Sequence, residues 1–273
     1  MSYDDVLDVL QATSRTFFLP VTRLPRGLQE AVASAYLCMR ALDEIEDHPD
    51  LAPGEKAAVL REVSRHLQAQ TSLPTFDAAS LRELLGTYQG KLPAVSLRLA
   101  DWAVQAPPGI APRIWEGTAA MADRMADWAE RGWSILTPAD LDRYTFSVAG
   151  SVGILLCDLL AFFEGVQVDR SMAVLFGRGL QLVNILRNRA EDVARGADFY
   201  PPGWGFDQVA AYARECLTAA EDYAMTVTSR AFRAMYTIPL KLALATLDAL
   251  RRGEAKLSRA AVLALVQQLD GES

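Results

Sequence analysis

The stretch from Gln181 to Asp192 reads QLVNILRNRAED and decides how the chain is expected to fold. Its leucine, isoleucine and valine residues recur at helical spacing, and the alternation typical of a strand is missing from it. Asn184, Asn188 and Asp192 follow one another at intervals of four residues, so a helix aligns them in one stripe with Gln181 one turn earlier. The stretch therefore predicts a helix whose apolar surface is crossed by a stripe of oxygen-bearing side chains.

Two interpretations of this stripe stay open. Burying polar side chains in an apolar helix is costly unless a ligand or partner meets them. The stripe could bind a metal ion through its oxygens, with Arg187 beside it to meet an anion. It could equally face water or form a network of amides between helices.

An acidic stretch lies earlier in the chain, where residues 36–47 read YLCMRALDEIED. Asp43 and Asp47 are four residues apart and project from one helical face, with Arg40 one turn earlier and Tyr36 one turn before that. Two carboxylates at this spacing repel each other unless a cation lies between them, and hard oxygen ligands suit Mg²⁺ bound jointly with a phosphate. The competing interpretation is a solvated acidic helix end.

Between these stretches, residues 144–153 read YTFSVAGSVG and concentrate small residues within a helical pattern. A glycine inside a helix costs about 1 kcal/mol relative to alanine. It is tolerated where two helices pack closely or where a bulky ligand needs space. Both explanations stay open for this segment.

The rest of the chain favours an all-α fold in a single domain, residues 1–273, because alanine and leucine dominate and prolines or glycines interrupt the sequence at helix-length intervals. The apolar run 148–166 contains Asp158 and Glu164, which favours a buried core helix over a membrane span. Helices are expected over 25–48, 53–70, 77–92, 138–164, 170–195, 206–233, 239–252 and 258–269, with a break at 107–109.

Composition narrows the classes of function. The chain has 34 acidic and 27 basic residues, a net charge of −7 that argues against nucleic-acid binding. Its two histidines exclude most multi-histidine metal sites. Its three cysteines have no CxxC spacing, and the acidic first residues do not resemble a signal peptide, so a cytoplasmic location is expected. Weak association with a membrane surface stays open.

Taken together, these segments resemble the squalene/phytoene synthase family, the head-to-head branch of the trans-isoprenyl diphosphate synthases. Residues 14–17, SRTF, are similar to its SRSF-type element, and residues 36–47 contain its DxxxD motif. Residues 144–153 are similar to its YxxxVAGxVG signature. Residues 181–192 are similar to its QxxNxxRDxxED motif, and the order of all four agrees.

The resemblance implies an isoprenoid-synthase helical bundle around a central apolar cavity. It also implies a prenyltransferase that uses Mg²⁺ and an allylic isoprenyl diphosphate, with the arginines on the diphosphate and the tyrosines at the reacting centre. The implied metal ligands are Asp43, Asp47, Asn184, Asn188 and Asp192. The implied catalytic residues are Tyr36, Arg40, Tyr144 and Arg187. The implied substrate-binding residues are Ser14, Thr16, Phe17, Val148, Ala149, Gly150 and Gln181.

Two positions depart from the family pattern. Asn188 stands where the family has aspartate, and Ala197 stands where it usually has arginine. Both changes weaken the handling of a second diphosphate. The leading hypothesis is therefore transfer of the prenyl group to a small-molecule acceptor, an aromatic one, as in secondary metabolism. The alternatives are a head-to-head synthase that tolerates Asn188, a terpene cyclase, and a non-catalytic partner subunit. The oligomeric state is not predicted.

Overall fold

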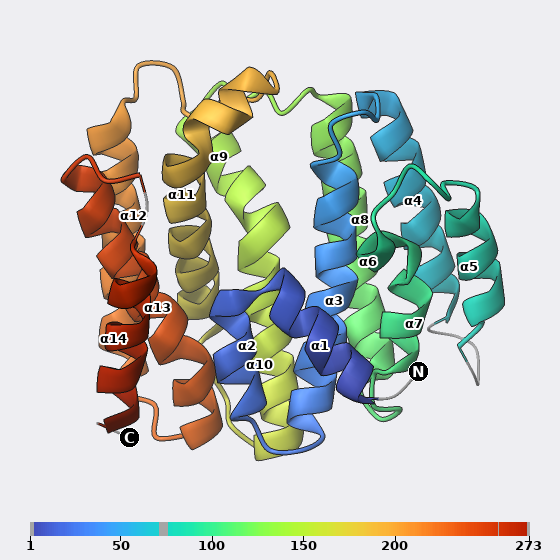
Figure 1. Ribbon diagram of the computed structural model, residues 1–273, viewed down its shortest axis with the longest axis horizontal. Helices are drawn as coiled ribbons and strands as arrows, with labels where there is room; N and C mark the ends of the chain where they lie inside the picture. Colours follow the sequence, from blue (N-terminus) through green and yellow to red (C-terminus); the bar gives the residue numbers. More distant parts are fainter. Residues whose placement is uncertain (1–2, 71–75, 256, 272–273) are drawn as a thin grey trace. The chain divides into compact units, whose positions relative to one another are not determined.

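The computed structural model describes residues 3–70, 76–255 and 257–271 of the chain. Within these residues the regular elements are helices and no strand occurs, so the all-α prediction is confirmed (Figure 1). By their contacts the residues divide into two compact units. Unit 1 comprises residues 1–133 and 161–165, and unit 2 comprises residues 134–160 and 166–273. The prediction of a single domain stays a prediction.

Unit 1 is built around one buried helix, α3, which contacts α6, α7 and α8. Beside it, α4 packs along the length of α8. Ser14 and Asp77 begin two of the helices, because their side chains accept hydrogen bonds from the first free main-chain N–H groups. The helices are α1 (Tyr3–Thr13), α2 (Arg15–Thr22), α3 (Leu28–Glu46), α4 (Pro53–Gln70), α5 (Ala78–Gly86), α6 (Ala94–Leu97), α7 (Leu99–Val104) and α8 (Ala111–Glu130).

Unit 2 is built around α11, which packs against α12 and also contacts α9, the π-helical turn η1 and α13. Thr137 caps α9 with Pro138 at its first position, as the sequence predicts. The last turn of α10, from Ala161, is counted with unit 1. The elements are α9 (Pro138–Thr145), η1 (Phe146–Gly150), α10 (Ser151–Glu164), α11 (Arg170–Ala194), α12 (Phe206–Ala224), α13 (Arg230–Arg251) and α14 (Arg259–Gly271).

Some predicted helix boundaries are wrong. The helix expected over 206–233 ends at Ala224, and α13 begins at Arg230 rather than at Pro239. The Ser229 side chain accepts a hydrogen bond from the N–H of Phe232 and so caps α13. Pro239 lies inside α13, where it removes one main-chain donor without ending the helix. The helix expected over 77–92 ends at Gly86.

The run Pro138–Glu164 is long and apolar enough to cross a membrane by length and composition, with a mean hydropathy of 2.0 over its window. Only 33% of that window is buried within the structure, less than expected for the core helix that the sequence predicts. A core helix of a soluble protein passes the same test, so this single run is weak evidence for a membrane span.

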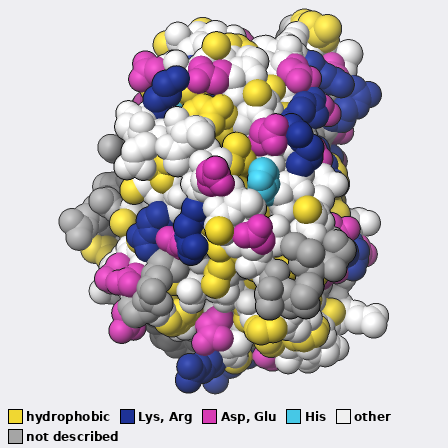
Figure 2. Space-filling view, turned by 90° about the vertical axis from the view of Figure 1, so that its right-hand side faces the viewer, with side chains coloured by type: hydrophobic (Ala, Val, Ile, Leu, Met, Phe, Trp, Pro, Cys, Tyr) yellow, Lys and Arg dark blue, Asp and Glu magenta, His cyan; other side chains and the backbone are white. Residues whose placement is uncertain are grey.

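The surface carries intermixed charge where it is shown. On the side of unit 1 seen in Figure 2, acidic and basic side chains lie among hydrophobic ones without separating by sign. Ion pairs between neighbouring helices are one cause of this mixing in unit 1. Arg61 of α4, for example, pairs with Asp127 and Glu130 of α8 at 2.7 and 2.8 Å.

Candidate active site

The acidic motif occupies the last turns of α3 in unit 1. Asp43 is half-buried, and Asp47 is the exposed residue that ends the helix, its N–H donating to the carbonyl of Asp43 at 2.8 Å. One turn earlier, Arg40 forms an ion pair with Glu44, and its Nη1 lies 3.9 Å from Oδ2 of Asp43. The predicted face with Arg40, Asp43 and Asp47 is therefore present as a local arrangement.

The electrostatics of this face favour a cation. Burial raises the pKa of Asp43 well above its usual range; Arg40 opposes the rise, and the carboxylates of Glu46, Asp47 and Glu44 add to it. Accumulating negative charge at a half-buried position costs free energy. A metal cation beside Asp43 would offset that cost, and carboxylate oxygens are the ligands that Mg²⁺ prefers.

Arg40 also carries a donor that suits an anion. Its Nε–H is buried and, among the described residues, has no hydrogen-bond acceptor. A buried donor without an acceptor costs free energy, which a phosphate oxygen would recover. Arg178 and Arg214 carry the same kind of Nε–H, so this feature supports an anion site beside Asp43 without defining one.

Part of the predicted substrate-binding N-terminal element packs near Tyr36, one turn before Arg40 on α3. Ser14 is buried and accepts from the N–H of Phe17 at 3.0 Å, which caps α2. The ring of Phe17 lies 6.0 Å from that of Tyr36, and Tyr36 donates from its hydroxyl to the carbonyl of Thr13 at 3.4 Å. Burial raises the pKa of Tyr36. The side chain of Thr16 lies outside the described part of the structure.

The predicted stripe lies on α11 in unit 2. Oδ1 of Asn184 accepts from Nη2 of Arg187 at 2.7 Å and from Nδ2 of Asn188 at 3.1 Å. Oδ1 of Asn188 accepts from Nε of Arg187 at 3.1 Å. Gln181 is half-buried one turn earlier. The amides of the stripe are therefore hydrogen-bonded within α11, completed by an arginine of the same helix, whereas the expected alternative was a network between helices.

Asp192 closes the stripe at a buried position, 7% exposed. Its Oδ1 accepts from Nη2 of Arg195 at 2.5 Å. Ala197, at the position where the family usually has arginine, is also buried, and its N–H donates to the carbonyl of Asp192 at 2.9 Å. The segment after α11 therefore folds back on Asp192.

The signature at residues 144–153 contains a feature that the sequence did not reveal. The helix makes a π-helical turn, η1, over Phe146–Gly150 and so carries one wider turn between α9 and α10. Val148 and Ala149 are half-buried and Gly150 is buried. A Cβ on Gly177 of α11 would lie 2.5 Å from the carbonyl oxygen of Ala149, so close helix packing explains these small residues. Their role in substrate binding stays a prediction.

Tyr144 is held at the start of this signature. Its buried ring stacks on Phe199 at 4.3 Å with an interplanar angle of 17°. Next to Phe199, Tyr200 lies under the guanidinium of Arg189 at 3.8 Å. Two consecutive aromatic residues of the segment after α11 are therefore fixed by different contacts.

A polar network joins α9, α11 and α12 in unit 2. Tyr212 donates from its hydroxyl to Oδ1 of Asp142 at 2.6 Å and accepts from Nη1 of Arg178 at 2.9 Å. Burial raises the pKa of Tyr212. Asp142 precedes Tyr144 by two residues on α9, so the network fixes Tyr144 relative to α11.

The structure describes each group of predicted metal ligands within its own unit. Asp43 and Asp47 belong to unit 1, and Asn184, Asn188 and Asp192 belong to unit 2. Among residues 3–70, 76–255 and 257–271, three or more histidine, cysteine, aspartate or glutamate side chains do not group to hold a metal ion by themselves. Mg²⁺ commonly takes part of its coordination from substrate phosphates and water, so two carboxylates fit its usual donor set.

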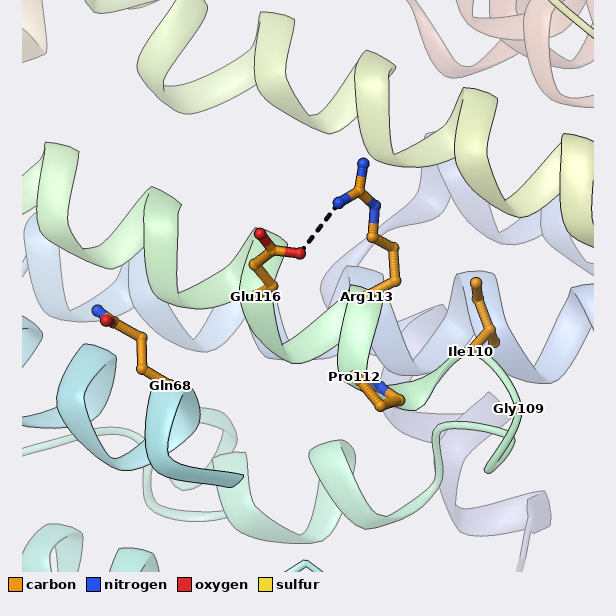
Figure 3. Close-up of a pocket in the computed structure, with 6 residues that line it drawn as sticks. All are labelled: Gln68, Gly109, Ile110, Pro112, Arg113 and Glu116. Atoms are coloured by element: carbon orange, nitrogen blue, oxygen red, sulfur yellow. Dashed lines mark hydrogen bonds and ion pairs between the residues drawn. The ribbon is translucent and has the colours of Figure 1, made fainter. Parts of the chain in front are cut away.

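A hollow of about 630 Å³ opens in unit 1 away from these residues (Figure 3). Arg113 and Glu116 of α8 point toward each other across its wall and form an ion pair of 3.0 Å. It contains no predicted site residue. Its lining residues are Gln68, Gly109, Ile110, Pro112, Arg113 and Glu116.

Sequence reasoning missed the residues that hold the end of the helix carrying the acidic motif. Glu46 is buried at the end of α3 and accepts from Nε1 of Trp133 at 2.8 Å. Lys56 of α4 is buried beside both. No local pattern links Glu46 to a tryptophan 87 residues away, although an acid in an otherwise apolar register was a usable signal.

Comparison with known proteins identifies the class of protein. A model of the squalene/phytoene synthase family matches residues 10–203. The chain belongs to the squalene/phytoene synthase family, a family of prenyltransferases.

Its relatives include two fungal enzymes. The chain is 32% identical over 213 residues to the squalene synthase of Eremothecium gossypii, covering 71% of this chain and 44% of that protein. It is 32% identical over 206 residues to the squalene synthase of Schizosaccharomyces pombe, covering 71% and 43%. The chain thus spans less than half the length of these curated relatives.

A solved structure supports the fold. TcSQS with the ligand E5700 superposes with a TM-score of 0.75 at 24% identity, covering 96% of this chain and 84% of that chain. The predicted isoprenoid-synthase fold is therefore confirmed. Both of these relatives are named squalene synthases, so they support the head-to-head alternative better than the leading hypothesis of a non-diphosphate acceptor.

Proposed function

We propose that this protein is a Mg²⁺-dependent prenyltransferase that joins two prenyl diphosphates head to head. The observation that carries the proposal is the face of α3, where Asp43 and Asp47 lie one turn apart with Arg40 a turn before Asp43. The resemblance of the whole motif set to enzymes of this reaction supports it.

The chemistry follows from charge. Diphosphate leaves carbon only when its negative charge is neutralised, and Mg²⁺ held by Asp43 and Asp47 would supply that as a Lewis acid. Arg40 contributes a permanent positive charge, and its buried Nε–H could donate to a phosphate oxygen. In the transfer, the bond between carbon and one diphosphate breaks, a carbon–carbon bond to the second prenyl chain forms, and a proton is lost.

The second unit supplies residues of similar character. Asn184, Asn188 and Asp192 offer amide and carboxylate oxygens along α11, and Arg187 is hydrogen-bonded within that stripe. We propose that this stripe binds diphosphate and its metal, with Arg187 turning from the amides to phosphate oxygens. The buried, stacked ring of Tyr144 offers an apolar, electron-rich surface for a developing carbocation.

A donor-only assay tests the proposal. The purified chain, Mg²⁺ and a labelled allylic diphosphate, with no other organic substrate, are expected to yield released diphosphate and a product containing two prenyl units. Mass detection of the product and a parallel reaction with excess chelator check this. Turnover that begins only when an aromatic acceptor is added would contradict the head-to-head assignment.

A second candidate function has a specific observation in its favour. At positions 188 and 197 this chain lacks the aspartate and the arginine with which the family handles a second diphosphate. The amide of Asn188 is instead hydrogen-bonded to Arg187 and Asn184. This pattern favours transfer of one prenyl group to a small-molecule acceptor. We keep it as the alternative that the donor-only assay separates from the first.

Restoring the family's acid gives a further prediction. Asn188→Asp keeps an acceptor for Arg187, removes the donor to Asn184 and adds a negative charge to the stripe. If the enzyme joins two diphosphates, formation of the two-prenyl product at limiting Mg²⁺ is expected to rise about tenfold, equivalent to about 1.4 kcal/mol. Initial rates across a Mg²⁺ titration measure the change.

The control adds the same charge elsewhere in unit 2. Gln208 of α12 is exposed and accepts from the N–H of Gly205, a bond that glutamate can also accept, so Gln208→Glu is expected to leave the Mg²⁺ dependence unchanged. An Asn188→Asp variant that gains nothing over this control would count against a second diphosphate at the stripe.

A further inference from the structure

Two buried charged residues lie side by side at the end of α3. Among the described residues, the buried charged side chains are Glu46, Lys56 and Asp192. Glu46 is 5% exposed and Lys56 is 7% exposed, and Nζ of Lys56 donates to the main-chain oxygen of Glu46 at 2.6 Å. Burying charge is costly, and apolar residues of similar size often give equal or greater stability, so this pair calls for a reason other than stability.

Trp133 completes the cluster. Its indole Nε1–H donates to Oε1 of Glu46 at 2.8 Å, and its ring faces Nζ of Lys56, which lies 5.0 Å from the ring centroid. The tryptophan thus contacts the acid through its edge and the base through its face. Together the three residues, Glu46, Lys56 and Trp133, form what we call the Glu46 cluster.

The backbone of Trp133 is strained. Its φ is +51°, and among the described residues it is the one non-glycine residue with a positive φ. A bulky side chain is disfavoured in this left-handed region, and such a conformation persists where surrounding contacts over-determine it. Here those contacts are the hydrogen bond to Glu46, the cation–π contact with Lys56, and the hydrogen bond from the N–H of Trp133 to the carbonyl of Trp128 at 3.0 Å.

The Glu46 cluster acts on the segment that carries the acidic motif. Glu46 lies between Asp43 and Asp47, and its carbonyl is one of the last in α3, where helices leave carbonyls without partners. Lys56 fixes that carbonyl and Trp133 fixes the side chain, so the last turn is held at two points. Asp43 lies one turn before Glu46, and Asp47 directly follows it, so both aspartates belong to the segment that is held.

We propose that Trp133 and Lys56 are positioning residues, which hold the last turn of α3 through Glu46 so that Asp43 and Asp47 present their carboxylates together to a metal-bound diphosphate. The inference rests on the proposed function, since it assumes that these two aspartates bind the metal. It assigns no chemical step to Glu46, Lys56 or Trp133.

Binding without turnover tests the proposal. Trp133→Phe in the full chain keeps an aromatic ring and removes the indole N–H. Calorimetric titration with Mg²⁺ and inorganic diphosphate is expected to show a dissociation constant raised about tenfold, the lower end of the effect of removing an outer partner of a metal ligand, because Trp133 acts on the ligands only through Glu46. Hydrogen exchange at the main-chain amide of Asp47 is expected to become faster in the same variant.

Two further variants separate positioning from general stability. Trp115 of α8 donates its indole N–H to the carbonyl of Ala103 at 3.0 Å, so Trp115→Phe loses the same kind of bond away from the motif and is expected to bind as the unmodified chain does. Glu46→Gln keeps an oxygen acceptor for Trp133 and is expected to bind more tightly than Trp133→Phe. Melting curves of all three verify folding.

The outcomes are distinct. Unchanged binding and unchanged exchange in Trp133→Phe would overturn the proposal. The proposal would also be overturned if Glu46→Gln lowered the affinity for Mg²⁺ and diphosphate as much as Asp43→Asn does while Trp133→Phe bound normally. Glu46 would then act on the metal itself. An unmodified chain that binds no Mg²⁺ and diphosphate contradicts the proposed function instead, and the exchange rate at Asp47 then decides whether Trp133 holds the turn.

Discussion

Replacing Asp43 with asparagine is expected to lower kcat/KM for the allylic diphosphate about 10³-fold, equivalent to about 4 kcal/mol of transition-state stabilisation. The amide keeps one oxygen but loses the charge that would hold Mg²⁺ beside Arg40. Steady-state kinetics at saturating Mg²⁺ measure the loss, and titration with Mg²⁺ separates weakened metal binding from slower chemistry.

The same change is not expected to unfold the protein. Burial raises the pKa of Asp43 in the folded chain, so the folded state binds this proton more tightly than the unfolded state does. Stability therefore falls as the pH rises from the unfolded value, about 3.9, toward the folded value. At neutral pH without metal, Asp43→Asn is expected to melt at the temperature of the unmodified chain or slightly above it.

A half-buried carboxylate outside the motif provides the control. Asp101 of α7 pairs with Arg82 at 2.7 Å in the same unit, and Asp101→Asn removes a charge without touching the acidic motif. Its kcat/KM is expected to match that of the unmodified chain. Equal losses in both variants, or a large drop in the melting temperature of Asp43→Asn, would show that Asp43 acts through the fold rather than on the substrate.

Replacing Gly177 with alanine is expected to destabilise unit 2 by about 3 kcal/mol, because the packing there leaves no room for a methyl group. Its Cβ would lie 2.5 Å from the carbonyl oxygen of Ala149 and 2.8 Å from the carbonyl carbon. Both atoms belong to the main chain of η1, which has to move as a whole. Thermal unfolding is expected to shift down by roughly 5–10 °C.

Two further substitutions serve as a second test and as a control. Gly153→Ala is expected to act alike, since its Cβ would lie 2.4 Å from the carbonyl oxygen of Ala173 on α11. Gly86 of α5 has no atom within 4 Å of such a Cβ, so Gly86→Ala is expected to leave stability unchanged or raise it by about 0.5 kcal/mol. A melting temperature of Gly177→Ala equal to that of Gly86→Ala would contradict close packing between η1 and α11.

The helices that the sequence predicted best were those that begin at a proline or a capping residue. The helix over 53–70 begins and ends where expected, and Pro138 begins α9 as its position after Thr137 indicates. The break between α12 and α13 was missed, since the apolar pattern continues through it and the capping contact of Ser229 is the deciding feature. Pro239 led to a wrong predicted helix start, because the proline lies inside α13 and does not begin it.

The motifs were predictable because helical spacing is a local property. Asp43 and Asp47 share a face once residues 36–47 are helical, and the stripe on α11 follows by the same rule. What each polar group contacts was not predictable. Arg187 completes the amide stripe and Arg195 pairs with Asp192, whereas the sequence placed only the first of these arginines beside the site.

The sequence by itself determined the helical class, the family and the spacing of the acids, because each depends on residue types a few positions apart. The tertiary structure decided why Gly177 and Gly153 must be glycine, since each faces the main chain of another helix. It also decided that Glu46 is buried against Trp133, a contact between residues 87 positions apart. Such contacts depend on how helices pack against one another, and helical periodicity carries no information about the neighbour that a face will meet.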